Sequence, residues 1–237
     1  DSLQGQTRGA LGQRLGQWLD GHLAELTMPL RRLQAAELEA PGRGLAFLLV
    51  EGLGNVRART ARPLLETLSK GDRARLTRLG VRFGVRHVYL SAMLDPRAIA
   101  LRTRLWAIQH RTAPLSAPAA PGVALGGDAI RSNEMAEAAG FEALAATWLR
   151  IDVVERLAAG LRARARAAPF TLDLELLRLT GLAEADLVPV VEALGYARDA
   201  EGRLHRRKAG RRRQARQPQP ARSATAFAAL GKIRAGR

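Results

Sequence analysis

The sequence predicts a mainly α-helical protein, in which a helical bundle is followed by a small winged-helix-like α+β unit and a disordered basic tail. Three observations predict this class. Leucine recurs at helical spacing in the first half, Pro, Ala and Gly crowd one central stretch, and Arg crowds the C-terminal end. Aromatic residues make up only 4% of the chain, so leucine and alanine must form most of the core.

These features divide the chain into four parts. The predicted parts are a helical bundle over 1–110, a Pro/Ala/Gly linker over 111–129, a winged-helix-like unit over 130–207 and a disordered basic tail over 208–237. The formal net charge is +16, and residues 203–237 hold 12 Lys and Arg without any acid. Residues 1–202 hold 26 basic and 22 acidic residues. A basic tail on a nearly balanced body is typical of proteins that bind RNA or DNA.

The bundle is expected to consist of short helices whose leucines face one core. Apolar residues at helical spacing predict these helices over residues 10–26, 28–38, 43–53, 60–69 and 71–79. Pro29 falls in the first turn of the second helix, where a missing backbone donor costs little. The helix over 43–53 is apolar nearly all round, which indicates a buried central position. Gly80 is the expected end of the last helix.

Apolar and basic residues alternate from Val81 to Leu90, as they do in a half-buried strand. Gly84 interrupts this alternation, so that short strands and an extended loop are equally open at this point. Asp95 and Pro96 then predict the start of another helix, with Asp95 as its cap and Pro96 at its first position.

The second unit is expected to combine helices with a terminal hairpin. Residues 143–151 fit a helix or a strand equally well, and Asp152 then caps a helix, with Glu155 completing a capping box. The remaining elements are a short helix ending at Gly181, a helix over 184–194 that Pro189 must kink or delay, and a hairpin over 196–207. Their order is that of a winged helix.

The sequence contains no recognised catalytic motif. It has no cysteine, no phosphate-binding loop of the Walker type and no pair of histidines at metal-ligand spacing. We therefore predict neither a catalytic residue, nor a cofactor, nor a metal site in this chain. No apolar run is long enough to cross a membrane and no signal peptide is recognisable, so a cytoplasmic location without a membrane partner is expected.

Two basic regions are candidates for nucleic-acid binding. In the first, cations alternate with rings that could stack on bases, and its candidate residues are Lys70, Arg82, Arg86, His87 and Tyr89. A solvated helix face beside core aromatics explains the same pattern equally well. The second region is denser, and its candidate residues are Arg206, Arg207, Lys208, Arg211, Arg212 and Arg213. Binding of RNA through phosphate, with little sequence preference, is the expected outcome.

Several segments resemble one family of helicases. They are Leu79-Gly80-Val81-Arg82-Phe83-Gly84-Val85-Arg86-His87-Val88-Tyr89-Leu90, Arg43-Gly44-Leu45-Ala46-Phe47, Leu105-Trp106-Ala107, Leu149-Arg150-Ile151-Asp152-Val153-Val154-Glu155-Arg156-Leu157, Ala193-Leu194-Gly195-Tyr196 and Phe227-Ala228-Ala229-Leu230. Together they resemble the region that follows the motor domains in alphaproteobacterial superfamily-two DExH RNA helicases. Those proteins are similar to the RNA helicase of the mitochondrial degradosome.

The resemblance implies an accessory C-terminal module. In such helicases, motor domains upstream bind ATP and Mg and pull a single strand of RNA, and the helical C-terminal part helps to hold that strand. The implied partners are single-stranded RNA, the protein's own motor domains and a ribonuclease. Two other functions remain open: a winged-helix regulator that binds duplex DNA, and a structural bundle that docks to proteins. The acids Glu184, Asp186 and Glu192 on the helix that would read DNA argue against the regulator.

Overall fold

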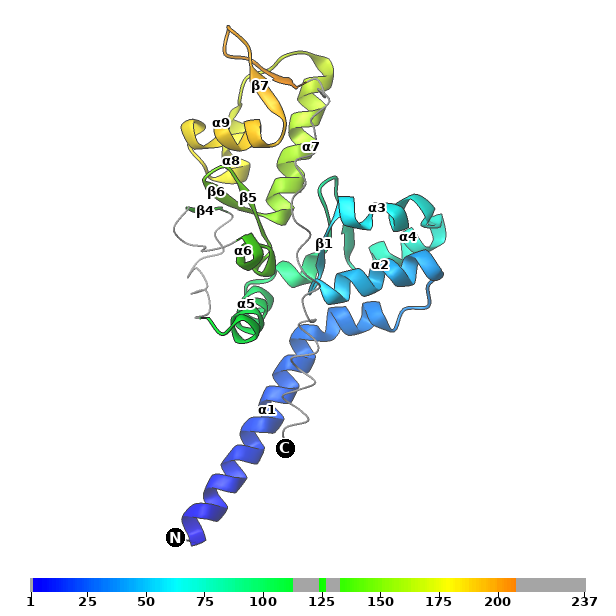
Figure 1. Ribbon diagram of the computed structural model, residues 1–237, viewed down its shortest axis with the longest axis vertical. Coiled ribbons are helices and arrows are strands. Elements are labelled where there is room, and N and C mark those ends of the chain that lie inside the picture. The colour runs from blue at the N-terminus through cyan, green and yellow to red at the C-terminus, as the bar shows by residue number, and fades with distance from the viewer. Residues whose placement is uncertain (1, 113–123, 127–132, 208–237) are drawn as a thin grey trace.

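The computed structural model describes residues 2–112, 124–126 and 133–207. Most of the predicted linker and the predicted disordered tail over 208–237 lie outside these ranges. The described part is mainly helical and contains small antiparallel sheets, so the predicted class is confirmed at this level. Figure 1 shows one long helix projecting from a body in which the remaining elements are packed together.

The projecting helix, α1, runs without a break over Ser2–Gln34. The prediction of two helices that meet just before Pro29 is therefore wrong. Proline inside a helix removes one backbone donor and normally costs about 3 kcal/mol. Here Leu30 directly follows it, Leu33 lies about one turn further on, and both are buried in the core. Their burial offsets the loss and holds the last turns of α1 in place.

The elements after α1 form a small sheet with helices around it. In order they are α2 (Ala40–Glu51), β1 (Asn55–Arg57), α3 (Ala58–Thr67), α4 (Lys70–Arg78), β2 (Val81–Phe83) and β3 (His87–Leu90). The sheet is antiparallel with the order β1-β3-β2, and every residue of the central strand β3 is buried. The alternating segment at 81–90 thus forms two strands joined by a tight turn at Gly84. The three-residue strand β1 was not predicted, because it is too short to show a period.

The buried central helix predicted over 43–53 is confirmed in the main. It corresponds to α2, in which Leu45 and Leu49 have no exposed surface. Phe47 is the exception, since it lies on the outer side of α2 and is largely exposed. Around α2 the core is built mostly of leucine from α1, α4 and β3, as the scarcity of aromatic residues requires.

The next helix begins as the sequence predicts. A short 3-10 helix, η1 (Ser91–Leu94), leads into α5 (Pro96–His110). The Asp95 carboxylate accepts a hydrogen bond of 2.9 Å from the backbone N–H of Arg97, and Pro96 occupies the first turn. Asp95 is therefore the cap of α5, and its carboxylate satisfies one of the backbone N–H groups that have no partner within the first turn.

A second small sheet precedes the longest helix of the C-terminal half. The elements are β4 (Ala124–Gly126), α6 (Asn133–Ala139), β5 (Phe141–Leu144), β6 (Thr147–Arg150) and α7 (Ile151–Ala167). The sheet is antiparallel with the order β4-β6-β5. The ambiguous segment at 143–151 is thus mostly strand. Strand β4 lies inside the predicted linker, so that at least these three residues are part of the fold.

Two short helices and the predicted hairpin complete the described chain. They are α8 (Leu174–Thr180), α9 (Glu184–Ala193), β7 (Tyr196–Arg198) and β8 (Leu204–Arg206). The hairpin is confirmed, because β7 and β8 pair antiparallel with Ala197 opposite His205. Helix α9 starts at Glu184 and continues through Pro189, so the delayed start considered for it does not occur.

The predicted bundle and the predicted second unit share a core. One cluster of buried residues joins Ile99 of α5 to Met135 of α6 and Phe141 of β5, with Trp106 and Trp148 packed against it. Residues from both sides of the expected linker therefore pack in direct contact. This joint core places β5 and α7 beside the turn between β2 and β3.

Candidate nucleic-acid interface

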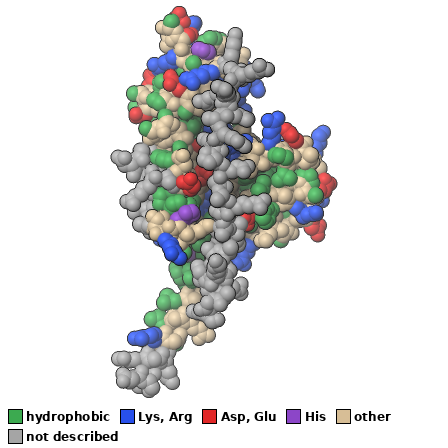
Figure 2. Space-filling view, in the orientation of Figure 1, with side chains coloured by type: hydrophobic (Ala, Val, Ile, Leu, Met, Phe, Trp, Pro, Cys, Tyr) green, Lys and Arg blue, Asp and Glu red, His purple; other side chains and the backbone are tan. Residues whose placement is uncertain are grey.

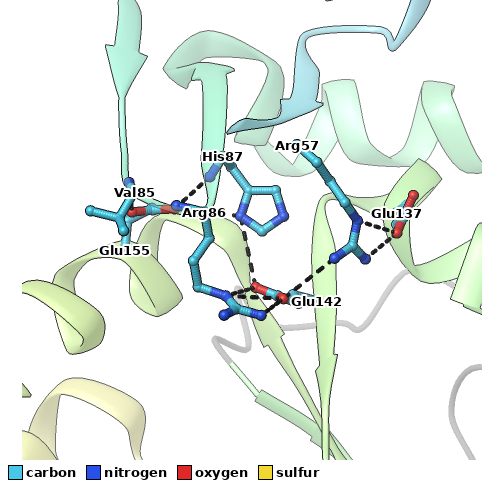
Figure 3. A network of polar contacts seen from close by, with 7 residues as sticks. All are labelled: Arg57, Val85, Arg86, His87, Glu137, Glu142 and Glu155. Carbon is cyan, nitrogen blue, oxygen red and sulfur yellow. Dashed lines mark hydrogen bonds and ion pairs between the residues drawn. The ribbon is translucent and has the colours of Figure 1, made fainter. Parts of the chain in front are cut away.

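The turn between β2 and β3 is held by a carboxylate from α7. One oxygen of Glu155 accepts hydrogen bonds from the backbone N–H groups of Arg86 and His87, at 2.8 and 2.7 Å, and the other accepts from Val85 at 2.6 Å (Figure 3). The predicted capping box is therefore wrong. The N-cap of α7 is Arg150, and Glu155 points away from its own helix terminus because three consecutive donors are available across the interface.

Gly84 is required by this contact. A Cβ atom added at Gly84 would lie 2.2 Å from the Glu155 carboxyl carbon and 2.4 Å from one of its oxygens. Real carbon atoms do not approach so closely, so any larger residue would push the carboxylate off its donors. The glycine that interrupts the alternating pattern of 81–90 thus marks the approach of α7.

Ion pairs surround the turn on the side of β5. Arg86 donates to both oxygens of Glu142 at 3.1 and 3.0 Å, and Arg57 donates to Glu137 at 2.9 Å (Figure 3). Glu142 is only 2% exposed, and Arg57 also lies 3.6 Å from it. The hydrogen bonds to Glu142 raise the pKa of Arg86 above its ordinary value despite the opposing effect of burial. Arg86 thus serves to neutralise a buried carboxylate.

Burial alone would raise the pKa of the Glu155 carboxyl. The neighbouring His87 ring and the three backbone donors favour its charged form, and together they hold its pKa below the ordinary value. A carboxylate that accepts several backbone N–H bonds generally behaves in this way. Glu155 is therefore an ionised group with its oxygens occupied, which makes it a structural anchor.

Two of the predicted RNA-binding residues belong to this network. His87 is 1% exposed, and its Nδ1 atom lies 3.5 Å from Glu155 and 3.7 Å from Glu142. A ring in this position cannot stack on a base. Arg86 is occupied by Glu142, and we correct the expectation for both residues. The pattern of cations and rings could not distinguish them from surface residues, because their partners lie more than fifty positions further along the chain.

The exposed cations lie on the outer face of α4 and continue onto β2. Lys70, Arg73 and Arg78 are all exposed, and within the described ranges no carboxylate pairs with them. The guanidinium of Arg73 lies 4.3 Å above the ring of Phe83, which it partly covers. We call Lys70, Arg73 and Arg78 the α4 face. Arg82 of β2 is also exposed and lacks an ion pair within the described chain.

The other predicted residues are divided between the hairpin and the undescribed tail. Arg206 and Arg207 lie at the end of β8 and are exposed. Lys208, Arg211, Arg212 and Arg213 lie outside the described residues. Tyr89 is mostly buried, but it lines a hollow with a volume of about 590 Å³ between η1 and the start of α7.

Sequence reasoning missed the arginines that line this hollow. Arg150 and Arg156 lie there beside Arg82 and Tyr89. Arg150 directly precedes α7 and Arg156 lies on it, six positions later. A spacing of six does not match the helical repeat, so the sequence pattern does not connect the two residues. Only the packing of α7 against the first sheet brings them to the side of Arg82.

Comparisons with protein-family models, with characterised proteins and with solved structures find no match to this chain. Among the described residues, no group of three or more His, Asp or Glu side chains is arranged to hold a metal ion. No helix in the same ranges has both the length and the apolar character that crossing a bilayer requires. The case for function therefore depends on the charges and surfaces described above.

Proposed function

We propose that this chain is an accessory C-terminal RNA-binding module of a cytoplasmic ATP-dependent RNA helicase. In this proposal it holds single-stranded RNA through phosphate contacts, while motor domains encoded elsewhere in the protein bind ATP and Mg and hydrolyse the nucleotide. The observation that carries the proposal is the α4 face, Lys70, Arg73 and Arg78, whose cations are exposed and unpaired within the described chain. The net charge of +16 and the resemblance to DExH helicases support it.

Phosphate contact is the mode of binding that this surface favours. Arg and Lys attract the RNA backbone by releasing its condensed counterions, and this term does not depend on sequence. The rings nearby are engaged in the fold, since Phe83 lies beneath Arg73 and the His87 ring is buried. We therefore expect weak sequence preference and a strong dependence of affinity on salt.

The finer proposal for the C-terminal half is a winged helix. Helix α7 is followed by a single bridge between Phe170 and Leu204, then by α8, α9 and the hairpin β7-β8. That order is the one expected of such a unit. The first turn of α9 carries Glu184 and Asp186, and Glu184 pairs with Arg198 at 3.2 Å. Acid at this end repels phosphate, so we assign contact to Arg206 and Arg207 of the hairpin and its continuation instead of α9.

Removing the three cations of the α4 face should weaken RNA binding and reduce its salt dependence. The triple variant Lys70→Ala, Arg73→Ala, Arg78→Ala loses three phosphate partners, so the slope of log K against log salt should become shallower by about 2. Fluorescence anisotropy with a labelled decamer of uridine, titrated at several salt concentrations, measures both quantities. The matched control is Arg62→Ala, because Arg62 is exposed but already paired with Glu66.

Failure of the unaltered chain to bind the decamer even at low salt would overturn direct RNA contact. An unchanged slope in the triple variant would remove the α4 face from the interface. A preference for one duplex DNA sequence over the decamer would favour the winged-helix regulator.

Docking to protein is the second candidate, and the projecting part of α1 favours it. Leu11, Leu15 and Leu19 are exposed along this helix, and Trp18 beside them is 65% exposed. Figure 2 shows hydrophobic side chains at the surface of the projecting helix. Exposed apolar side chains that gather in one patch usually mark an interaction surface. We assign this stripe to contact with the protein's own motor domains, which the resemblance places upstream. In the full-length helicase, Trp18→Glu should then lower RNA-stimulated ATP hydrolysis without changing the RNA affinity of the isolated chain.

A further inference from the structure

The hollow between η1 and the start of α7 has the features of a binding site. Arg82 and Tyr89 face each other across β2 and β3, where they are paired in register. Arg150 and Arg156 reach the same hollow from α7 and the residue before it. Elements from both halves of the chain therefore converge on one concavity of about 590 Å³.

The hollow is lined by more arginines than carboxylates, and its carboxylates are already engaged in the fold. Asp152 is engaged by Arg150, which donates to its two oxygens at 2.6 and 2.9 Å. Asp95 is engaged as the cap of α5. Arg156 lies 3.8 Å from Asp152, at the outer limit of an ion pair, and its side chain is 59% exposed. Arg82 has no ion pair among the described residues, and Arg156 has only this long contact with an aspartate that Arg150 already engages, so both guanidinium groups can bind an anion.

Tyr89 contributes a donor that has no partner. The residue is 9% exposed, and no described residue forms a hydrogen bond with its hydroxyl. Burial raises the pKa of this phenol, the charges of Asp152 and Glu155 raise it further, and Arg82 and Arg156 oppose them less strongly. The phenol therefore keeps its proton at neutral pH. Tyr89 lines the hollow, and its hydroxyl, which no described residue engages, can donate a hydrogen bond to a ligand oxygen there.

We propose that this hollow binds a phosphate group of the RNA, held by the guanidinium groups of Arg82 and Arg156 and by the hydroxyl of Tyr89. The inference rests on the proposed RNA-binding function and adds a defined phosphate position to it. Arginine matches phosphate because its planar fork donates two parallel hydrogen bonds. The phosphate is either an internal diester or the terminal monoester of the RNA strand, because both carry the anionic oxygens that arginine recognises.

The test compares two altered residues of the hollow with one matched control. Tyr89→Phe removes only the hydroxyl and keeps the buried ring, and Arg156→Ala removes a cation whose side chain is mostly exposed. The control Arg166→Ala removes an exposed arginine from the same helix, ten residues further on. Uridine decamers with and without a 5′-phosphate, labelled at the 3′ end, are titrated into the full chain by anisotropy. Thermal melting of each variant verifies that it folds.

Each variant of the hollow should weaken RNA binding by about tenfold, because a hydrogen bond to a charged group is lost. The control should stay within about twofold, since it leaves every contact in the hollow intact. Equal losses for both decamers assign the site to an internal diester. A loss confined to the phosphorylated decamer assigns it to the terminal phosphate.

Wild-type affinity of both variants for both decamers would overturn the hollow as a phosphate site and leave the α4 face unaffected. If the unaltered chain binds neither decamer, the proposed function fails, and uridine monophosphate becomes the probe. Calorimetric binding of that nucleotide, lost in Tyr89→Phe, would then sustain the phosphate site. No binding of the nucleotide would overturn it.

Discussion

Replacing Glu155 with alanine is expected to lower the free energy of unfolding by about 3–5 kcal/mol. The carboxylate accepts hydrogen bonds from three consecutive backbone donors, those of Val85, Arg86 and His87. Shortening the side chain leaves these donors beneath α7 without an acceptor, and an unpaired buried donor costs about 1–3 kcal/mol. Urea denaturation followed by circular dichroism measures the change.

Glu175→Ala is the matched control for this substitution. Glu175 is also a carboxylate on a helix of the C-terminal half, but its side chain is 82% exposed and its partner is the arginine at 164. Surface pairs of this kind contribute about 0–1 kcal/mol. If Glu155→Ala costs no more than Glu175→Ala, the turn is held by apolar packing and the anchor role of Glu155 is wrong.

The same anchor should make stability sensitive to acid. The pKa of Glu155 is lowered in the folded protein, so the unfolded chain takes up its proton first as the pH falls. The contribution of Glu155 is therefore complete above the unfolded value of about 4.3 and is lost as the pH falls through the lower folded pKa. Asp152 and Asp173 also have lowered pKa values, so only the difference between wild type and Glu155→Gln isolates this group.

The helices and the hairpin could be predicted because each is encoded by local periodicity or a local signal. Asp95-Pro96 is a local signal for the start of a helix, and the register of leucines decides which face is buried. The helix break expected at Pro29 does not occur, because this expectation also came from a local signal alone. A local signal for helix termination was outweighed by the burial of Leu30 and Leu33, which depends on the rest of the fold.

The candidate site was less predictable, because a charge in a sequence does not reveal its partner. Arg86 and Arg82 lie in the same alternating pattern, yet one neutralises Glu142 and the other faces solvent. Arg102 is a more extreme case. It is fully buried on α5, where it donates to the carbonyl oxygens of Met93 and Glu137, and burial lowers its pKa to about 10. Nothing in its neighbourhood along the chain marks it as different from a surface arginine.

Glu155 illustrates the same difficulty for short motifs. Asp-x-x-Glu before an apolar helix is the pattern of a capping box, and it fits the start of α7 by sequence alone. The alternative acceptor role requires a turn with three free N–H groups in contact with α7. That turn belongs to a segment seventy positions earlier, so no local rule could select between the two roles.

Gly84→Ala should destabilise the protein by about 2–4 kcal/mol, and most of that cost should disappear when Glu155 is also alanine. The three atoms nearest to the added Cβ all belong to the Glu155 side chain beyond its own Cβ, at 2.2, 2.4 and 2.7 Å. In the wild-type background the carboxylate must leave its donors to make room, so the substitution loses nearly what Glu155→Ala loses. With those atoms removed, the turn can accept the methyl group.

A double-mutant cycle measures this dependence as a coupling free energy of about 2 kcal/mol between the two positions. Gly71→Ala is the control for the general effect of alanine in place of glycine. Gly71 lies in the first turn of α4 with only the Ser69 hydroxyl, at 3.9 Å, near its added Cβ, so alanine there should stabilise the helix by at most about 1 kcal/mol, the difference between the two residues in a helix interior. Additive costs for Gly84→Ala and Glu155→Ala would mean that the turn needs glycine for its own backbone conformation. The close approach of α7 would then not be the reason for the glycine, and the interruption in the strand pattern would carry no information about the interface.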